Sequence, residues 1–230
     1  MISSLTFRTG YPTRIEGIRK QTITFTDRLN ILLGPNGSGK STILRTLAQS
    51  TGCGNGGWSD NRDTWDLPYE VAVDWDGWPI FYHDCHTHSE QSFIAPDYLE
   101  NHQLLRSTGE KRIGLINELI DYIENRFLTY KLKRHERPTL LLDEVDNHVG
   151  FAGQSVMWHD ILPRLGKKYQ LIVATHSVFP LLLRKESSLR TDNVIQLSQG
   201  YDNICLEELR RAITFFNTEG DGNSRHDGVP

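Results

Sequence analysis

A glycine-rich loop at residues 34–41, with the sequence GPNGSGKS, constrains this chain more than any other feature. A β-like run at 28–33 leads straight into the loop, and a segment of helical character at 41–48 follows it. The glycines allow a tight curl in which successive amide N–H groups face inward, and the following helix directs its positive end to the same point. A strand, this loop and a helix in that order predict a phosphate-binding site.

The side chains of the loop extend the prediction from phosphate to a nucleoside triphosphate. Lys40 supplies a point charge near the β- and γ-phosphates, and Ser41 supplies a hydroxyl for Mg²⁺. We therefore expect ATP and Mg²⁺ as cofactors. The residues predicted to contact ATP are Gly34, Pro35, Asn36, Gly37, Ser38, Gly39, Lys40, Ser41 and Thr42.

A second motif, TLLLDE at residues 139–144, is a short apolar strand that ends in two carboxylates. Open α/β sheets bind their ligands at the carboxyl ends of their strands. Asp143 is predicted to hold Mg²⁺ through water, and Glu144 to act as general base on the attacking water, a role worth roughly 10²–10⁴-fold in rate. An acidic pair after a core strand can also be a plain surface feature, but the glycine loop upstream argues against that alternative.

His176 follows another apolar run, QLIVAT at residues 170–175. An imidazole just past a buried strand can reach the γ-phosphate and sense its presence. A lone histidine at such a place is often structural. Its position, 32 residues after Glu144, favours the catalytic alternative.

The order of the segments predicts an α/β fold with a mostly parallel core sheet flanked by helices. Asp76-Gly77, between two β-like runs, is a strong hairpin signal, so we expect a small antiparallel arm at 58–83. Residues 1–216 are predicted to form one domain, and 217–230 a disordered tail. The predicted strands are 2–7, 22–25, 28–33, 69–75, 78–83, 139–142, 170–175 and 194–197, and the predicted helices are 41–48, 109–130, 154–162 and 207–216.

The composition of the chain limits the class of protein and the cellular compartment that we expect. The 230 residues are 37% hydrophobic and 23% charged, as in a globular domain with its own core. A net charge of -4 argues against a protein that coats a polyanion. Three cysteines fit a reducing compartment better than a disulfide framework. No secretory leader and no run long enough to cross a bilayer is found, so we expect a cytoplasmic protein without membrane insertion.

Together, these motifs resemble the ABC class of P-loop ATPases over about residues 1–200. The segment STGEK resembles the signature of that class, in a helical region expected at 91–137. The resemblance implies that Ser107, Gly109 and Glu110 contact the γ-phosphate of an ATP held by a second subunit. The alternative for this segment is an ordinary helix N-cap.

The resemblance also implies a glutamine that touches Mg²⁺ and the attacking water. Gln91 is the first candidate, because it follows the expected antiparallel arm, and Gln103 is the second. Gln91 is therefore a predicted catalytic residue and metal ligand, beside Ser41 and Asp143.

The segment after Glu144 indicates a branch within the class. It reads Val145-Asp146-Asn147-His148 and lacks the proline and the downstream Ser-Ala-Leu-Asp of transporter subunits. The chain looks more like the stand-alone branch of RecF-like, SMC-like and overcoming-lysogenization-defect-type ATPases. That resemblance implies an ATP-hydrolysing, nucleotide-gated homodimer, with Asp146, Asn147 and His148 as interface candidates.

The stand-alone branch further implies a switch or motor in DNA-related processes such as repair or phage defence, with a separate effector or nuclease as partner and DNA as a second partner. The alternative is the nucleotide-binding subunit of an ABC transporter. A non-enzymatic ATP-sensing scaffold is a third hypothesis, against which the intact Asp143-Glu144 pair argues.

Three weaker signals leave alternatives open. The cluster HDCHTH at 83–88 carries metal-binding residue types, but its spacing is more typical of a solvated loop. Adenine is expected to stack on Tyr11 or Arg14, and Phe25 is equally a core residue. A set of basic residues either contacts DNA phosphates or is simply solvated. These are Lys131, Lys133, Arg134, Arg137, Lys167 and Lys168.

Overall fold

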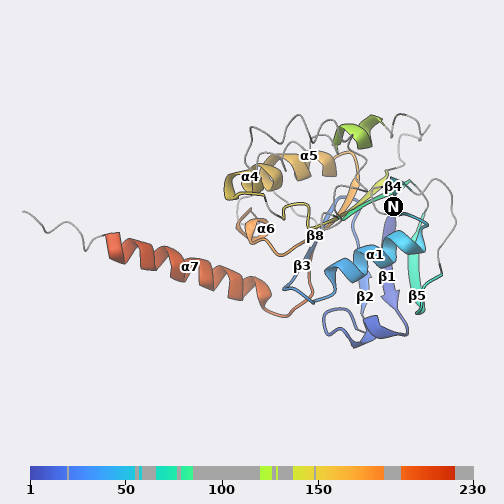
Figure 1. Ribbon diagram of the computed structural model, residues 1–230, viewed down its shortest axis with the longest axis horizontal. Helices are drawn as coiled ribbons and strands as arrows, with labels where there is room; N and C mark the ends of the chain where they lie inside the picture. The colour runs from blue at the N-terminus through green and yellow to red at the C-terminus, as the bar shows by residue number, and fades with distance from the viewer. Residues whose placement is uncertain are drawn as a thin grey trace, which may run out of the picture.

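The computed structural model shows three layers (Figure 1). A parallel sheet lies in the middle. Helix α1, Lys40–Ser50, and a small antiparallel sheet cover one face. Helices α4, Phe151–Val156, and α5, Leu162–Gly166, cover the other. The structure describes residues 1–19, 21–54, 57–58, 66–76, 79–84, 120–125, 128, 137–147, 149–183 and 193–220.

The central sheet has the strand order β4-β6-β7-β8-β3-β9. Five of its strands run parallel, and β4 joins the edge antiparallel to β6. β8 lies between β3, which leads into the glycine loop, and β7, which ends in the acidic pair. The strands are β3 (Leu29–Leu33), β4 (Gly57–Trp58), β6 (Ile80–Asp84), β7 (Thr139–Asp143), β8 (Gln170–Thr175) and β9 (Asn193–Gln196).

Alternate side chains of the central strands face the two covering layers. In β7, Leu140 and Leu142 belong to the core on the side of α4 and α5, whereas Leu141 belongs to the core on the side of α1. Every residue of β3, β7 and β8 is buried. A strand covered on both faces needs a nearly continuous apolar run, and this explains why the sequence revealed these three strands.

The covering helices extend the predicted ones. α1 starts one residue before the predicted helix and ends two residues after it. α4 (Phe151–Val156), the π-helical turn η3 (Met157–Ile161) and α5 (Leu162–Gly166) follow one another without a break, so the predicted helix at 154–162 is longer at both ends. Residues 120–125 are helical, inside the predicted helix at 109–130.

The second sheet is antiparallel and has the order β2-β1-β5. Its strands are β1 (Ile2–Phe7), β2 (Thr22–Thr24) and β5 (Val71–Trp75). The predicted hairpin between residues 69–75 and 78–83 is wrong, because β5 pairs with β1 and β6 pairs with β7. The physical reason is burial: Ile80, Phe81 and Tyr82 are consecutive buried residues, and only the central sheet covers both of their faces.

Gln170 joins the two sheets. Its buried amide accepts hydrogen bonds from Ile2 N at 2.7 Å and Thr139 Oγ1 at 2.8 Å, and donates to the carbonyls of Ile2 and Thr26, both at 2.7 Å. One side chain therefore satisfies main-chain groups of β1 and of the turn before β3. A buried amide with all of these bonds made contributes strongly to the relative placement of the two sheets.

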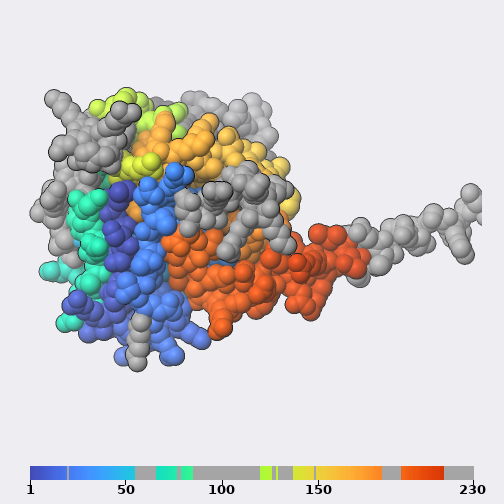
Figure 2. All heavy atoms as spheres, turned by 180° about the vertical axis from the view of Figure 1, so that it is seen from behind, coloured from blue at the N-terminus to red at the C-terminus, as the bar shows by residue number. Residues whose placement is uncertain are grey.

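Three further helical elements are η1 (Tyr11–Arg14), α6 (Phe179–Leu183) and α7 (Tyr201–Gly220). α7 stands away from the body as an arm (Figures 1 and 2). It is longer at both ends than the predicted helix at 207–216 and reaches into the range predicted as tail; residues 221–230 lie outside the described residues. Among the described segments, no helix combines the length and the apolar character that crossing a membrane requires.

Candidate phosphate and metal site

The glycine loop joins β3 to α1, as predicted, and its backbone takes conformations that glycine favours. Gly37 has φ 78° and Gly39 has φ 102°, both in the left-handed region. A Cβ added at Gly34 would lie 2.7 Å from Ser38 Oγ. Residues 34–39 therefore form a tight loop, and Lys40, Ser41 and Thr42 form the first turn of α1.

Lys40 is only 4% exposed and folds back into the loop. Its Nζ donates to the carbonyl oxygens of Gly34, at 2.7 Å, and Pro35, at 3.0 Å. Burial lowers the pKa of Lys40, while the carboxylates of Glu144, Asp143 and Asp146 act in the opposite direction. The ammonium group is thus kept at the loop by two neutral acceptors, which a phosphate oxygen can replace with a stronger, charge-assisted bond.

Asp143, at the carboxyl end of β7, meets Ser41 across the start of α1. Ser41 Oγ donates to Asp143 Oδ1 at 3.2 Å. The other oxygen, Oδ2, is buried and has no hydrogen-bond partner in the described part of the chain. Burial raises the pKa of Asp143 to about 6; the bond from Ser41 lowers it, and the charges of Asp84 and Glu144 raise it further.

The unpartnered Oδ2 of Asp143 is the observation that tests whether the site fits the predicted Mg²⁺. A buried acceptor without a partner is costly, and a divalent cation beside it would remove that cost. The described residues contain no group of three or more His, Cys, Asp or Glu side chains that could hold a metal. Mg²⁺ does not require one, since it binds through one or two protein groups together with water and phosphate oxygens. Ser41 and Asp143 therefore fit Mg²⁺.

Glu144 follows Asp143 in a strained backbone conformation. It has φ 50° and is the one non-glycine residue with positive φ among the described residues. Its N–H donates to the carbonyl of Ala174 in β8 at 2.9 Å, and the residue is 7% exposed. Strain of this kind costs about 1–3 kcal/mol and clusters at functional sites.

His176 lies beside Glu144, because β8 is the strand next to β7. The distance from His176 Nδ1 to Glu144 Oε1 is 3.5 Å, and the histidine side chain is 45% exposed. The fold thus brings together the glycine loop, Asp143, Glu144 and His176 from three adjacent strand ends. An exposed imidazole beside a buried carboxylate at this place can contact both a bound ligand and the carboxylate.

Arg45 and Asp84 also belong to this neighbourhood; Arg45 was missed from the sequence, and Asp84 was noted only as part of the His-rich cluster at 83–88. Asp84 ends β6 in register with Asp143, and Arg45 Nη2 lies 2.8 Å from its Oδ2. Arg45 follows Ser41 by one helical turn, so α1 directs one side chain to β7 and the next to β6. The Asp84 interaction is also the largest cause of the raised pKa of Arg45. The helical spacing from Ser41 was the signal available for Arg45.

Asp146 was predicted as an interface residue, and its side chain instead points into its own subunit. It is 3% exposed. Its Oδ2 accepts from Trp158 Nε1 at 3.0 Å and from Thr175 Oγ1 at 2.7 Å. In this conformation the carboxylate connects the turn after Glu144 to η3 and to β8, and it is buried within its own subunit. Asn147 is part of the same turn, and His148 lies outside the described residues.

Several predicted site residues also lie outside the described residues: Gln91, Gln103, Ser107, Gly109 and Glu110, together with 85–88 of the His-rich cluster and Lys131, Lys133 and Arg134. Two of the basic residues that are described have acidic partners. Lys168 Nζ lies 2.6 Å from Glu124 Oε1, and Arg137 Nη1 lies 3.9 Å from Asp27 Oδ2. These pairs reduce the positive charge available for a nucleic-acid backbone.

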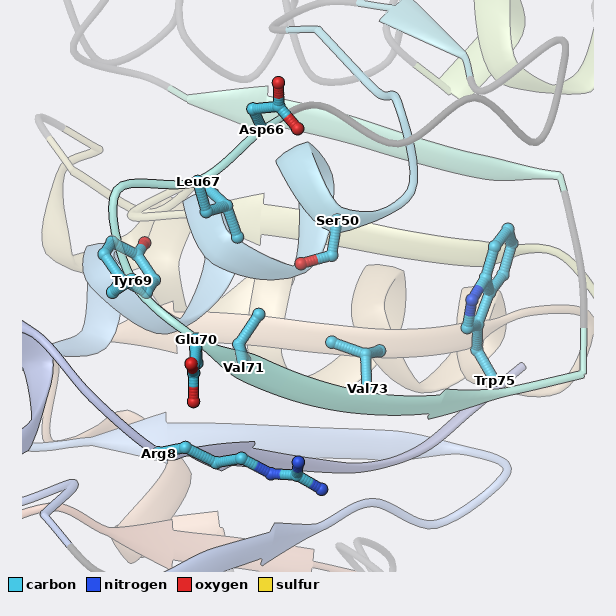
Figure 3. A pocket seen from close by; sticks show the side chains of 9 residues that line it. All are labelled: Arg8, Ser50, Asp66, Leu67, Tyr69, Glu70, Val71, Val73 and Trp75. Carbon is cyan, nitrogen blue, oxygen red and sulfur yellow. The ribbon is translucent and has the colours of Figure 1, made fainter.

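A hollow of about 460 Å³ lies at the other end of α1 (Figure 3). Ser50, the last residue of α1, lines it, so it is roughly 15 Å along the helix from the glycine loop. Tyr69, another lining residue, donates or accepts a 2.7 Å hydrogen bond with Thr46 and packs edge-on against Tyr11, with ring centroids 5.4 Å apart. Tyr11 is 53% exposed, so one predicted adenine partner is accessible.

The loop, the acidic strand beside it and the intervening β8 define a P-loop protein of the ABC class. Residues 14–134 match the family described as an AAA domain. This match spans just over half of the chain, and the chain belongs to that family. It ends before β7, so the acidic pair is placed by the structure and not by the match.

No curated protein matches the chain. Among solved structures, one described as a candidate cobalt transport ATP-binding protein matches with a TM-score of 0.38 and 21% identity, covering 81% of this chain and 74% of that one. A likeness this distant has no bearing on substrate, partner or cellular role.

Proposed function

We propose that this chain is a Mg²⁺-dependent ATPase that works as a nucleotide-gated dimer. The observation that carries the proposal is the meeting of Ser41 and Asp143 at 3.2 Å, with a buried carboxylate oxygen left unpartnered beside the phosphate loop. If the loop were only a structural turn, the buried carboxylate beside it would cost folding free energy without binding any ligand. Bound Mg²⁺ would neutralise charge on the β- and γ-phosphates.

The roles of the residues follow from where they lie. The loop amides and Lys40 bind the phosphates, and Ser41 and Asp143 hold the metal. Glu144 accepts the proton of the attacking water, and its strained backbone fixes the carboxylate at the end of the strand. His176, 3.5 Å from Glu144, orients that carboxylate and contacts the γ-phosphate.

The dimer rests on the resemblance to ABC-class ATPases and on Ser107, Gly109, Glu110 and Gln91. In this proposal the segment around Ser107 closes over the γ-phosphate bound by the second subunit, and Gln91 contacts the metal and the attacking water. Two ATP molecules are then buried at a two-fold interface. Hydrolysis reopens the pair, because only the triphosphate contacts both halves.

The cellular role that fits the stand-alone branch is a switch acting with a separate effector, such as a nuclease, on DNA. The negative net charge and the paired Lys168 and Arg137 argue that any DNA contact is local. ATP turnover measured with and without duplex DNA tests this part. If duplex DNA left the rate of ATP turnover unchanged at both low and high salt, DNA would be removed from the proposal.

Glu144→Gln tests the central claim. The variant keeps the shape of the side chain but cannot accept a proton, so we expect turnover to fall at least about 100-fold while MgATP still binds. Size measurement by light scattering should then show a dimer with MgATP and a smaller species without it. Lys40→Ala is the matched control that loses nucleotide binding. Normal turnover by Glu144→Gln would remove Glu144 from its role.

Ser107→Arg tests the signature separately. A bulky cation at the predicted closing surface should prevent the ATP-dependent dimer of the Glu144→Gln protein without weakening MgATP binding to the monomer. Association that persists in the double variant would show that residues 107–111 only cap a helix.

A further inference from the structure

The two residues that flank His176 are held by hydrogen bonds, although the imidazole itself is exposed. Thr175, the last residue of β8, is fully buried. Its Oγ1 accepts a hydrogen bond from the main-chain N–H of Ser177 at 2.9 Å, so this one side chain spans the histidine from one neighbour to the other. The direction in which the chain leaves β8, and with it the place of His176, therefore depends on the hydroxyl of Thr175.

The hydroxyl of Thr175 is itself oriented by Asp146. It donates to Asp146 Oδ2 at 2.7 Å. A hydroxyl has one hydrogen to donate, so this bond turns its lone pairs to the acceptor side, where the N–H of Ser177 lies. Trp158 Nε1 donates to the same carboxylate oxygen at 3.0 Å and holds it against η3. The buried carboxylate thus determines how Thr175 holds the backbone after β8.

α4 holds Ser177 a second time. Ser177 Oγ donates to Gln154 Oε1 at 2.8 Å, and Gln154 Nε2 donates to the carbonyl of Val149 at 3.0 Å. Val149 belongs to the segment that follows Glu144. Both neighbours of His176 are therefore connected, through side chains, to the segment that carries the proposed general base.

These contacts join the two side chains that the proposed reaction uses together. The N–H of Glu144 donates to the carbonyl of Ala174 at 2.9 Å, and His176 Nδ1 lies 3.5 Å from Glu144 Oε1. A displacement of about 1 Å between reacting groups can cost on the order of 10²-fold in rate. The distance between this imidazole and this carboxylate is thus a quantity that the surrounding hydrogen bonds can control.

The surroundings of Asp146 favour a positioning role over proton transfer. The carboxylate is 3% exposed, and the hydrogen bonds that it accepts from Trp158 and Thr175 come from uncharged groups. Burial raises the pKa of Asp146, and the bonds from Thr175 and Trp158 act in the opposite direction. Its effect on a ligand at the phosphate loop therefore passes through the side chains that it holds.

We propose that Asp146 and Thr175 are positioning residues, which hold His176 at the γ-phosphate and beside Glu144. The proposal rests on the proposed function and deepens it, because it assigns the residues that place the imidazole. The segment after Glu144, which the sequence suggests as a subunit interface, then also acts within its own subunit.

Thr175→Val tests the role, since valine keeps the volume and the branched shape but has no hydroxyl. Asp146 then loses one donor, and the N–H of Ser177 loses its acceptor. We expect kcat for ATP turnover to fall at least about tenfold, while the Kd for MgATP from titration calorimetry changes less than about threefold. Thr175→Ser retains the hydroxyl and should keep kcat within about threefold of the unmodified chain.

A double variant shows whether the effect passes through His176. In the His176→Ala protein there is no imidazole to position, so adding Thr175→Val should lower kcat by less than a further factor of about two. Losses that multiply in the double variant would mean that Thr175 acts independently of His176, and would overturn the proposal.

Thr139→Val is the matched control. Thr139 is also a fully buried threonine of the central sheet, and its Oγ1 donates to Gln170 Oε1 at 2.8 Å. It begins β7, at the opposite end of the strand from Asp143. Thermal melts should show that both valine variants fold, and Thr139→Val should leave kcat unchanged. An equal fall in kcat for both variants would attribute it to general destabilisation and overturn the proposal.

Gln154→Met decides the question if Thr175→Val does not fold, because this half-buried side chain lies on a covering helix. It breaks the bond to Ser177 and should lower kcat about threefold, a loss that disappears in the His176→Ala protein. An unchanged kcat would then overturn the proposal. An unmodified chain without ATP turnover would overturn the proposed function and this role together, whereas turnover that these variants leave unchanged would overturn the positioning role alone.

Discussion

Two neighbouring residues, Asp143 and Glu144, are each held in an unfavourable state. Asp143 is fully buried with one oxygen unpartnered, and Glu144 has a positive φ. Costs that accumulate at one point of a domain are typical of a site that a ligand completes.

Asp143→Asn should therefore stabilise the ligand-free protein. The pKa of Asp143 is raised from 3.8 to about 6, so its contribution to stability is full below about 4 and is lost as the pH rises through about 6. At pH 7.5 the variant should gain up to about 3 kcal/mol in free energy of unfolding, and this gain should vanish near pH 4. Urea unfolding at several pH values measures it.

The matching control for Asp143→Asn is MgATP. The ligand should raise the stability of the unmodified chain more than that of the variant, because the carboxylate that holds the metal is absent from the variant. A variant that is less stable than the unmodified protein at pH 7.5 would show that Asp143 is not strained by burial.

At the scale of elements, the sequence predicted which strands are buried but did not predict which strands pair with β5 and β6. β3, β7 and β8 are runs of apolar residues covered on both faces, so their existence and their polar ends could be inferred. The partners of β5 could not, since Asp76-Gly77 fits a hairpin locally and only the burial of both faces of β6 decides against it. The pairing of Arg45 with Asp84 depends on the same unpredicted placement of β6.

Arg45 and Asp84 tie α1 to β6, and a double-mutant cycle should detect this contact. Arg45→Met removes the charged partner of the buried Asp84, whose Oδ2 also accepts a hydrogen bond from Tyr82 at 3.5 Å, and should lower the free energy of unfolding by about 2 kcal/mol. Half of the Arg45 side chain is exposed, which limits the loss. Adding Asp84→Asn should recover most of it. A loss in the double variant that equals the sum of the losses in Arg45→Met and Asp84→Asn would mean that the pair contributes nothing.

Gln170 makes a similar link between the two sheets. Gln170→Leu keeps the volume but removes four hydrogen bonds, leaving buried main-chain groups of Ile2 without partners. We expect a loss of about 3 kcal/mol in chemical denaturation. Gln21→Leu, at an exposed position, is the control and should change stability by less than about 0.5 kcal/mol. Similar values for the two variants would contradict the bridging role.

At the scale of the whole molecule, α7 lies outside the two hydrophobic cores of the body. Both core clusters are built from residues up to Leu197, and no residue of α7 belongs to either of them. The candidate phosphate and metal site likewise lies at the ends of β3, β7 and β8, within the body. A chain that ends at residue 200 should therefore melt within about 2 °C of the full chain and bind MgATP with the same affinity. Differential scanning calorimetry and titration calorimetry measure the two quantities. A much lower melting temperature for the shortened chain would show that α7 contributes to the stability of the body, and this prediction would then be wrong.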